Sequence, residues 1–495
     1  MYHSISIAVK DEKLIEYFDT LSKNYNNMIN VTHYHIRQCM TGLKKLESER
    51  FDNEKEVING IAAALPLMNG PKLTKDGRPK KTKLRKVKPN AKKQTKPKEK
   101  TGFEMPTAEK WFLGKYFLDA YFKVTKNADY YNLPAQVNQD AITDAIESWT
   151  GYFEKLKSEA NTDKPNPPHY RKSGGYATVT LSNQICTIKK NKLTFPKTKL
   201  TLDLGNVNFL KYTLKETKVK RVYGTFYVVM TLDDGAEAPA ISEEPKRILG
   251  IDLGVSNIVT ISNNIGLTPI VVKGGVIKSY NQWFNKKCAE LQSDIDKKIE
   301  NIRNGLNAKE QKDAIFAYRS RFIKDIFHKI SNFIIDYSIE NTIDAIVIGK
   351  SNGWKHESNM DRERNQAFCM IPHNQLIDYI QYKAEAAGIK VIINEESYTS
   401  KASFLDNNYI PTYGQDIGKQ KFSGSRVKRG LYKSKNGTLL NADVNGASNI
   451  IRKAIPEAFD GIKDFSYLWK TVISKKYHDF TVLPKYKYPC VKTGS

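Results

Sequence analysis

Apolar residues in the first third of the chain follow two spacings, one typical of a strand and one typical of a helix. Apolar residues alternate with polar ones over residues 3–10, which predicts a strand with Ile5 and Val9 on one face. Over residues 14–46 the apolar positions recur every three to four residues, and this spacing predicts a helix. Residues 111–157 return to the helical spacing. The N-terminal strand is therefore expected to lead into a helical region.

Strand patterns resume after residue 176. Three segments combine alternation with β-branched or aromatic side chains, namely residues 177–181, 193–204 and 223–232. Together with the N-terminal strand they predict a small β-barrel built from residues 1–10 and 166–245. The helices between these two parts, residues 11–165, are expected to form a domain inserted in the barrel.

The second half of the chain alternates between strand and helix patterns, which is typical of an α/β layered core. Strands are predicted within residues 248–272, 345–349 and 389–394, and helices at residues 278–303, 308–340 and 376–387. Strands that lead into acidic residues indicate an RNase H-like nuclease fold. We assign this domain to residues 246–398 and 441–456, an insert to residues 399–440, and a C-terminal tail to residues 457–495.

The charge of the chain favours a polyanionic partner. Lys and Arg number 79 against 53 Asp and Glu, which gives a formal net charge of +26. Neutralising phosphates releases condensed counterions, so such an excess promotes binding to nucleic acid. Residues 72–100 hold fourteen Lys or Arg and two acids. We expect this segment to be disordered and to add salt-dependent, sequence-independent binding.

Cysteine usage and hydropathy indicate the compartment. No stretch of about 20 apolar residues is present and no apolar segment follows the start, so neither a membrane span nor a signal peptide is predicted. The five cysteines are scattered without a Cys-x-x-Cys pair. This pattern is typical of a reducing cytosol. We therefore expect a cytoplasmic bacterial protein that acts at the nucleoid and has no membrane partner.

Carboxylates stand where apolar strands end or helices begin. Asp252 lies in a strand pattern flanked by glycines, and Asp443 lies at the start of a helix pattern, where a capping role is the alternative. The strand at residues 345–349 ends in Gly349 without a carboxylate, whereas the next strand ends in Glu395 and Glu396. Carboxylates that converge in a basic protein indicate a site for Mg²⁺, which prefers hard oxygen ligands.

Basic and aromatic residues outside this set are candidates for nucleic-acid contact, with a solvated surface as the alternative. They lie in the first predicted helix, in a basic, proline-rich segment, in the helix at residues 308–340, after the strand at 345–349, and in the insert. The candidates are Arg37, Tyr170, Arg171, Lys172, Arg319, Arg321, Lys355, Arg426, Lys428 and Arg429.

Four segments resemble the RuvC nuclease motifs of TnpB, a family of transposon-encoded RNA-guided DNA endonucleases ancestral to the type V CRISPR effectors. The resemblance runs from Ile248 to Arg452 in the order and spacing of the family. The N-terminal half is similar only loosely, through Asn24-Tyr25-Asn26 and the layout of a wedge-like barrel with an inserted helical recognition domain. The four segments are Ile251–Gly254, Ile348–Lys355, Glu395–Lys401 and Asn441–Ala447.

The resemblance also bears on the second carboxylate. In a rearranged subset of the family, the catalytic glutamate lies just before a Thr-Ser pair. In this chain that position corresponds to Glu396, with Glu395 as the close rival.

Two departures from the family change the expectation. The family usually carries a zinc ribbon built from Cys pairs, but residues 401–406 and 422–437 contain no cysteine, so no structural zinc is expected. The chain is also longer than compact TnpB proteins and is more similar to a miniature type V-F effector. Some of those effectors work as homodimers on one guide RNA. The transposon and CRISPR settings, and a monomer or a homodimer, both stay open.

The resemblance implies an RNA-guided DNA endonuclease. Its partners would be a guide RNA and target DNA, both double- and single-stranded. Asp252, Glu396 and Asp443 would be the catalytic residues and the ligands of a pair of Mg²⁺ ions. A nuclease-inactive RNA-guided repressor of the same family is the first alternative, which Gly349 favours. An RNase H-like transposase that binds DNA ends directly is the second.

Overall fold

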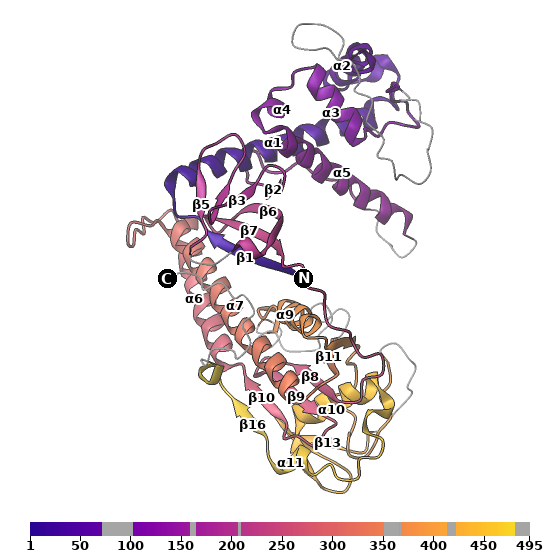
Figure 1. Cartoon of the computed structure of the whole chain (residues 1–495), viewed down its shortest axis with the longest axis vertical. Coiled ribbons are helices and arrows are strands. Elements are labelled where there is room, and N and C mark those ends of the chain that lie inside the picture. Colours follow the sequence, from indigo (N-terminus) through magenta and orange to yellow (C-terminus); the bar gives the residue numbers. More distant parts are fainter. Residues whose placement is uncertain are drawn as a thin grey trace. The chain divides into compact units, whose positions relative to one another are not determined.

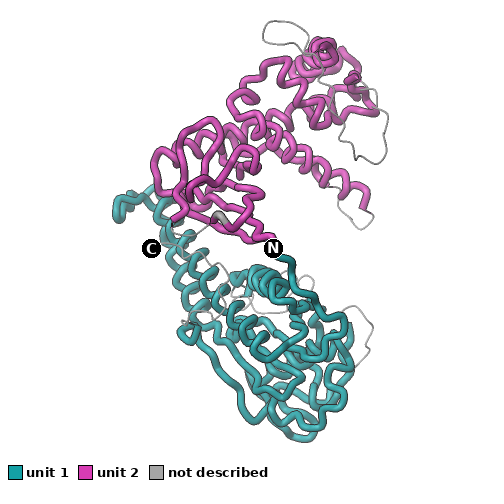
Figure 2. The backbone as a smooth tube through the Cα atoms, in the orientation of Figure 1, with its two compact units in different colours: residues 1, 236–492 teal, residues 2–235, 493–495 magenta. Residues whose placement is uncertain are grey.

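Two compact units make up the chain (Figure 2). Residues 2–235 form one, and residue 1 with the described residues from 236 to 480 forms the other. The boundary falls at residue 235 rather than at the expected 245. The computed structural model describes residues 1–71, 102–158, 165–205, 209–350, 366, 368–412 and 422–480. The segment predicted to be disordered, residues 72–100, lies outside the described residues.

Helix α1 (Glu12–Gly42) organises the helical part of the first unit (Figure 1). It begins at Asp11, whose side chain accepts a hydrogen bond from the Leu14 amide at 2.9 Å. Its apolar face is buried along its length, as the helical spacing predicts. Around it lie α2 (Asp52–Asn69), α3 (Lys115–Val124), α4 (Ala128–Asn132), α5 (Ala135–Lys157) and the short 3₁₀ turn η1 (Glu47–Glu49).

The helix predicted over residues 111–157 is present as three helices, α3, α4 and α5. Asn127 caps α4, accepting from the Tyr130 amide at 3.0 Å, and Pro134 starts α5. Helix α2 was not predicted. Helix α5 contributes the fully buried Trp149, whose indole Nε1 donates to His33 Nδ1 of α1 at 3.0 Å.

The strands of this unit form two sheets rather than the predicted closed barrel. A four-stranded antiparallel sheet has the order β1-β7-β6-β2, and a three-stranded sheet has the order β3-β4-β5. In the part of the chain that the structure describes, no strand pairing joins the two sheets or closes either one, so the barrel is not confirmed. The strands are β1 (Tyr2–Ala8), β2 (Val179–Ser182), β3 (Thr187–Lys189), β4 (Lys192–Thr194), β5 (Thr201–Asp203), β6 (Thr213–Val222) and β7 (Thr225–Asp233), with the turn η2 (Phe209–Lys211).

The helices of the first unit lie, in sequence, between two paired strands of one sheet. Strand β1 pairs with β7 in register from Tyr2 opposite Asp233 to Ala8 opposite Tyr227. The chain therefore leaves this sheet after β1 and returns to it, with β2, β6 and β7, only after the helices.

The second unit is built on a six-stranded mixed sheet of order β12-β11-β8-β9-β10-β16. Strands β8, β11 and β12 run parallel, whereas β9 is antiparallel to both β8 and β10. The strands are β8 (Ile248–Leu253), β9 (Asn257–Asn263), β10 (Ile270–Lys273), β11 (Ala345–Gly349), β12 (Lys390–Asn394) and β16 (Ile473–Lys475). The sheet confirms the predicted α/β layered core.

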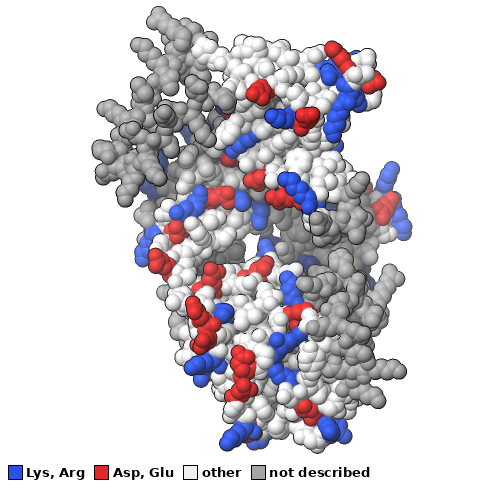
Figure 3. Space-filling view, turned by 90° about the vertical axis from the view of Figure 1, so that its right-hand side faces the viewer, with Lys and Arg blue, Asp and Glu red and all other residues white. Residues whose placement is uncertain are grey.

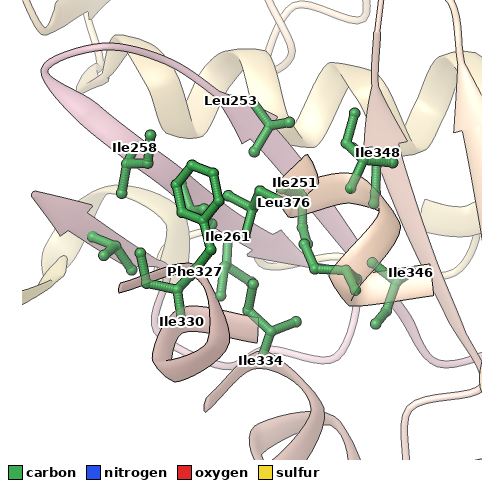
Figure 4. Packing of buried hydrophobic residues seen from close by; sticks show 14 of the residues in the cluster. Ile251, Leu253, Ile258, Ile261, Phe327, Ile330, Ile334, Ile346, Ile348 and Leu376 are labelled. Atoms are coloured by element: carbon green, nitrogen blue, oxygen red, sulfur yellow. The ribbon is translucent and has the colours of Figure 1, made fainter. Parts of the chain in front are cut away.

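Helices cover both faces of this sheet. Alternate residues of β8 and β11, including Ile251 and Ile348, pack with Phe327 and Leu376 in one apolar cluster (Figure 4). The residues between them face the other way, where Val347 packs with Ile450 of α10. The helices are α6 (Gly275–Asp296), α7 (Ala308–Glu340), α9 (His373–Ala386) and α10 (Ala442–Ala454). Because side chains alternate along a strand, Asp252 lies on the α10 side of the sheet.

The residues assigned to a C-terminal tail are instead part of this unit, as far as residue 480. Strand β16 extends the sheet parallel to β10, and Leu468 is fully buried in the cluster on the α10 side. Edge pairing and apolar burial bring this segment into the fold, and neither is visible in its weak local pattern. The elements are η3 (Pro456–Phe459), α11 (Tyr467–Lys470), β16 and η4 (Tyr477–Phe480). Among the described residues, no helix combines the length and apolar character needed to cross a membrane.

Helix α10 approaches β8 so closely that only glycine fits at the contact. A β-carbon built on Gly250 would lie 2.4 Å from the Ala447 carbonyl oxygen and 2.5 Å from Ile451 Cγ1. The first of these atoms belongs to the backbone of α10 and cannot turn aside. Any side chain at position 250 therefore has to move the helix away from the sheet.

We predict that Gly250→Ala destabilises the second unit by about 1–3 kcal/mol, the usual cost of overpacking a core. Chemical denaturation followed by circular dichroism measures this cost. Gly275→Ala is the matched control, because a β-carbon on Gly275 meets nothing within 4 Å. Equal stability of the two variants would contradict the close packing.

Candidate active site

Asp252 and Asp443 come together because α10 packs on β8. Asp252 lies near the end of β8, and Asp443 lies in the first turn of α10. The helix is capped by Asn441, whose side-chain oxygen accepts from the amides of Asp443 and Val444 at 2.9 and 3.2 Å. The alternative that Asp443 caps the helix is therefore wrong, and its carboxylate is available for other contacts.

Glycines leave room for two of the three carboxylates. A β-carbon on Gly446 of α10 would lie 2.7 Å from Asp252 Oδ2. A β-carbon on Gly349, at the end of β11, would lie 2.9 Å from Glu396 Oε2. The side chain of Glu396 thus occupies the space that a residue larger than glycine would fill at the end of β11.

The three carboxylates interact electrostatically. Burial raises the pKa of Asp252 well above its ordinary value, and the negative charges of Glu396 and Asp443 raise it further, while Arg426 opposes them. Like charges this close are unfavourable unless a cation compensates them. Asp443 Oδ2 accepts from Asn257 Nδ2 at 2.7 Å, and Asp443 Oδ1 lies 3.5 Å from Arg426 Nη2.

The donor set fits a divalent cation that prefers oxygen ligands. It consists of three carboxylates on one side of the sheet, brought by β8, by α10 and by the segment after β12. In the conformations that the described side chains adopt, no three His, Cys, Asp or Glu are arranged as a ready-made metal site. Cation binding therefore requires the carboxylates to turn toward a common point.

Glu395 and Glu396 have different surroundings. Glu395 Oε2 pairs with Lys453 Nζ, and Glu395 Oε1 accepts from the Ser397 amide at 2.8 Å. Burial raises the pKa of Glu395, but the hydrogen bonds from Lys453 and Ser397 outweigh it and hold that pKa below its ordinary value. The negative charge of Glu396, in contrast, raises the pKa of Asp252. The geometry therefore favours Glu396 over its neighbour as the third carboxylate of the site.

Part of the insert lies beside these carboxylates. It forms a three-stranded sheet of β13 (Ser425–Lys428), β14 (Leu431–Lys433) and β15 (Leu439–Asn441). Arg426 approaches Asp443, and Arg429 Nη2 donates to Ser256 Oγ at 2.6 Å. Lys428 is exposed on the same hairpin. The structure thus places two of the predicted nucleic-acid contacts at the candidate site and a third on the hairpin that carries them.

Two other predicted contacts make hydrogen bonds within the protein. Arg319 of α7 donates to Asn281 Oδ1 at 2.9 Å and to the Met370 carbonyl at 2.6 Å. Arg37 donates to the Pro167 and Pro168 carbonyls, and its guanidinium lies 5.2 Å from the ring centre of Tyr170.

Four of the predicted contacts remain at the surface. Tyr170 is 48% exposed, and Arg171, Lys172 and Arg321 are exposed as well. Lys355 lies outside the described residues. On the face drawn in Figure 3, positive and negative side chains are interspersed. The net positive charge is therefore not gathered into one continuous patch on that face.

Sequence reasoning missed the polar residues of α10 that hold the segment after β12. Asn445 Nδ2 donates to the Ala402 carbonyl at 2.8 Å, and Asn449 Nδ2 donates to the Thr399 carbonyl at 2.8 Å. Both asparagines are fully buried. A stripe of amides spaced four residues apart on a helix with many apolar positions was the available signal.

The Asp406 carboxylate connects separate parts of the insert. Asp406 Oδ2 accepts from Ser423 Oγ at 2.8 Å and from the Lys435 amide at 2.9 Å. Asn408 adds a second link, since its side-chain oxygen accepts from the Ser403 and Ser423 amides, both at 3.1 Å. Hydrogen bonds thus join the two ends of the insert.

Two family models match the second unit and extend slightly beyond it. A probable transposase family, OrfB_IS605, matches residues 233–355, and a domain described as Cas12f1-like TNB matches residues 373–450. The first match contains Asp252, and the second contains both Glu396 and Asp443. The candidate site is therefore formed by residues from both matched regions.

Two curated relatives are similar to parts of the chain. The TnpB-like protein ORF457 of Acidianus two-tailed virus is 24% identical over 221 residues, which are 44% of this chain and 44% of the relative. The CRISPR-associated endodeoxyribonuclease Cas12f2 of a Micrarchaeota archaeon is 24% identical over 259 residues, 49% of this chain and 43% of the relative. The chain thus spans less than half the length of either relative.

Solved structures of related effectors are similar over more of the chain. A Cas12f1–sgRNA–target DNA complex covers 91% of this chain and 98% of its own at 12% identity, with a TM-score of 0.30. A CRISPR-Cas12f ternary complex covers 89% and 82% at 14% identity, with a TM-score of 0.31. Scores this low carry no argument about how the parts are arranged.

The fold and the carboxylates define an α/β protein with a candidate metal-dependent site. Together with the family matches, they support a nuclease-type family. The chain resembles TnpB and the miniature type V CRISPR effectors, as its motifs indicate.

The absence of structural zinc stays a prediction. We expect elemental analysis of the purified protein to find less than stoichiometric zinc, because a structural site needs four nitrogen or sulfur ligands. The insert between residues 399 and 440 contains no cysteine or histidine. One tightly held zinc ion per chain would contradict this.

We predict that Asp406→Asn loosens the insert without unfolding the α/β core. Hydrogen exchange of residues 422–441 should rise, because the amide side chain accepts these hydrogen bonds less strongly than the carboxylate does. Burial raises the pKa of Asp406, but the Ser403 hydroxyl, the Lys435 amide and the Ser423 hydroxyl outweigh it and hold that pKa below its ordinary value. The stabilisation is therefore present above the ordinary carboxyl pKa and is lost as the pH falls through the lower folded-state pKa.

The matched control is Asp460→Asn, because Asp460 is an exposed carboxylate outside the insert. Unchanged exchange in the insert of Asp406→Asn would show that this carboxylate does not hold the segment together.

Proposed function

We propose that this chain is an RNA-guided DNA endonuclease that cleaves DNA by Mg²⁺-dependent hydrolysis of phosphodiesters. The observation that carries the proposal is the placement of Asp252, Glu396 and Asp443 on one side of the sheet. Asp252 Oδ2 lies against Gly446, in the same helix as Asp443, and Glu396 Oε2 lies against Gly349 at the end of β11, the strand that pairs with β8. Burial, and then the charges of Glu396 and Asp443, raise the pKa of Asp252. The chain brings them together from β8, from the segment after β12, and from α10, across 191 residues (from 252 to 443). Separate elements that bring carboxylates together in a basic protein are well suited to divalent-metal chemistry on a polyanion.

The residues of the site have distinct roles in this proposal. Asp252, Glu396 and Asp443 would hold Mg²⁺, which supplies electrostatic stabilisation at the attacking and leaving oxygens when bound. Asn257 orients Asp443 by donating to its Oδ2 at 2.7 Å. Arg426 and Arg429 lie beside the carboxylates, where their guanidinium groups can bind the phosphates of the substrate strand.

The proposed partners are a guide RNA and target DNA. The curated relatives described as a TnpB-like protein and as the CRISPR-associated endodeoxyribonuclease Cas12f2 support this choice, as does the net charge of +26. Base pairing with the guide would read the target sequence, while the protein binds the backbone. The basic residues 72–100, outside the described part, would add salt-dependent affinity.

The nuclease-inactive alternative drew its support from Gly349, where the strand ends without a carboxylate. A side chain at that position would meet Glu396 Oε2, since even a β-carbon would lie 2.9 Å away. Gly349 is therefore compatible with a site whose glutamate comes from the next strand, and it no longer favours loss of activity.

We expect Asp443→Asn and Glu396→Gln each to lower the rate of DNA cleavage by roughly 10²–10³-fold, because each removes a charge that stabilises the transition state. Guided DNA binding should persist, since it depends on phosphate contacts and base pairing. The protein is purified with its native RNA, and cleavage of complementary DNA in Mg²⁺ is measured beside a native-gel binding assay.

Asp460→Asn and Glu457→Gln are the matched controls, since both side chains are exposed in the same unit. Cleavage by Asp443→Asn or Glu396→Gln at the wild-type rate would remove that residue from the site. A wild-type protein that binds guided DNA without cutting it would support the repressor. Purification without RNA, together with direct binding to DNA ends, would support the transposase.

A further inference from the structure

Lys453 is a nearly buried lysine that the proposed chemistry does not use. It lies in the last turn of α10, and its side chain is 8% exposed. A buried ammonium group is costly unless acceptors satisfy it. Its Nζ meets this requirement with three acceptors: a Glu395 carboxylate oxygen, the Ser397 carbonyl at 2.9 Å and the Pro411 carbonyl at 3.0 Å.

These contacts hold one short turn both through a side chain and through the backbone. The Lys453 ammonium binds both the side chain of Glu395 and the backbone carbonyl two residues later. The other oxygen of Glu395 accepts from the amide of that same residue, Ser397, at 2.8 Å. The two neighbours of Glu396, Glu395 and Ser397, are therefore both held in place.

The fixed turn determines which glutamate reaches the site. With Glu395 bound toward Lys453, Glu396 is directed toward Gly349, where its Oε2 lies, and toward Asp252. Releasing Glu395 would free the turn and remove this constraint.

The rest of α10 supports the same segment. Asn449 Nδ2 donates to the Thr399 and Ala402 carbonyls at 2.8 and 2.7 Å, and Arg452 Nη2 donates to the Asn408 carbonyl at 2.7 Å. One helix thus carries Asp443 at its beginning and, further along, the groups that hold the chain bearing Glu396. Lys453 is the member of this set that contacts the turn around Glu396.

We propose that Lys453 and Glu395 form a positioning pair that fixes the turn after β12, so that Glu396 and not Glu395 is presented to Asp252 and Asp443. The inference rests on the proposed function, because it concerns the arrangement of the proposed metal ligands. Lys453 acts through Glu396 and touches no reacting atom. Partners of this kind, which orient a ligand, typically change metal affinity or activity by about 10–100-fold.

The test compares Lys453→Met, Glu395→Gln and the double variant with the wild type, each loaded with its native RNA. Binding of Mn²⁺ is measured by electron paramagnetic resonance, and the Mg²⁺ concentration for half-maximal cleavage is measured separately from the maximal rate. Lys463→Met is the matched control, because Lys463 is exposed in the same unit.

We expect each single variant to weaken Mn²⁺ binding and raise the required Mg²⁺ concentration by about 10-fold, with RNA and DNA affinity unchanged. The double variant should be no worse than the worse single variant, because both remove one interaction. Lys453→Arg should restore part of the loss, since the guanidinium keeps the charge and the donors.

A merely structural lysine would give a different result. Lys453→Met would then lower the melting temperature without changing Mn²⁺ affinity, or the two single effects would add, and either result would overturn the proposal. If Lys453→Met does not fold, Glu395→Gln decides by the same Mn²⁺ measurement. Failure of the proposed function is distinguishable, because the wild type itself would then neither bind Mn²⁺ at this site nor cut DNA, and Asp443→Asn would change nothing.

Discussion

The close approach of α10 to β8 sets the geometry on which the candidate site depends. Gly250 on the strand and Gly446 on the helix lack side chains where the two elements meet, and a β-carbon on either would lie within 3 Å of an atom of the other element. This contact places the first turn of α10 beside the end of β8. Asp443 and Asp252 become neighbours as a result, although they are far apart in the chain.

Helix α10 carries a carboxylate of the candidate site at its beginning and buried hydrogen-bond donors further along. At its beginning the site gathers negative charge, which is unfavourable in a buried position without a cation. Further along, α10 presents buried amides and cations to backbone carbonyls, so that each buried polar group has a partner. The hydrogen-bonded part keeps the segment after β12 rigid, and this rigidity allows repelling carboxylates to remain close. A helix with only apolar contacts would allow the segment to move away and relieve the repulsion.

In the insert, hydrogen bonds connect segments that lie far apart in the chain. In the family that the chain resembles, cysteine pairs and zinc usually hold this region together. Here the Asp406 carboxylate and the Asn408 amide connect residues 403, 423 and 435 through hydrogen bonds. Each such bond contributes far less than a metal–thiolate site does. The insert is therefore expected to open more easily than a zinc ribbon, which matters for a segment whose Arg426 and Arg429 lie beside the carboxylates.

The sequence by itself determined the elements with a strong local pattern and the order of the carboxylates. The helix at residues 308–340 and the strand at 345–349 have the predicted bounds, because hydrophobic periodicity and turn residues act within a short stretch of chain. The tertiary structure alone decided that the N-terminal strands form two separate sheets, that β16 joins the six-stranded sheet, and that Lys453 binds Glu395 while Glu396 lies near Asp252. These outcomes depend on pairs of residues far apart in the chain, and their contact energies arise only once the elements pack together.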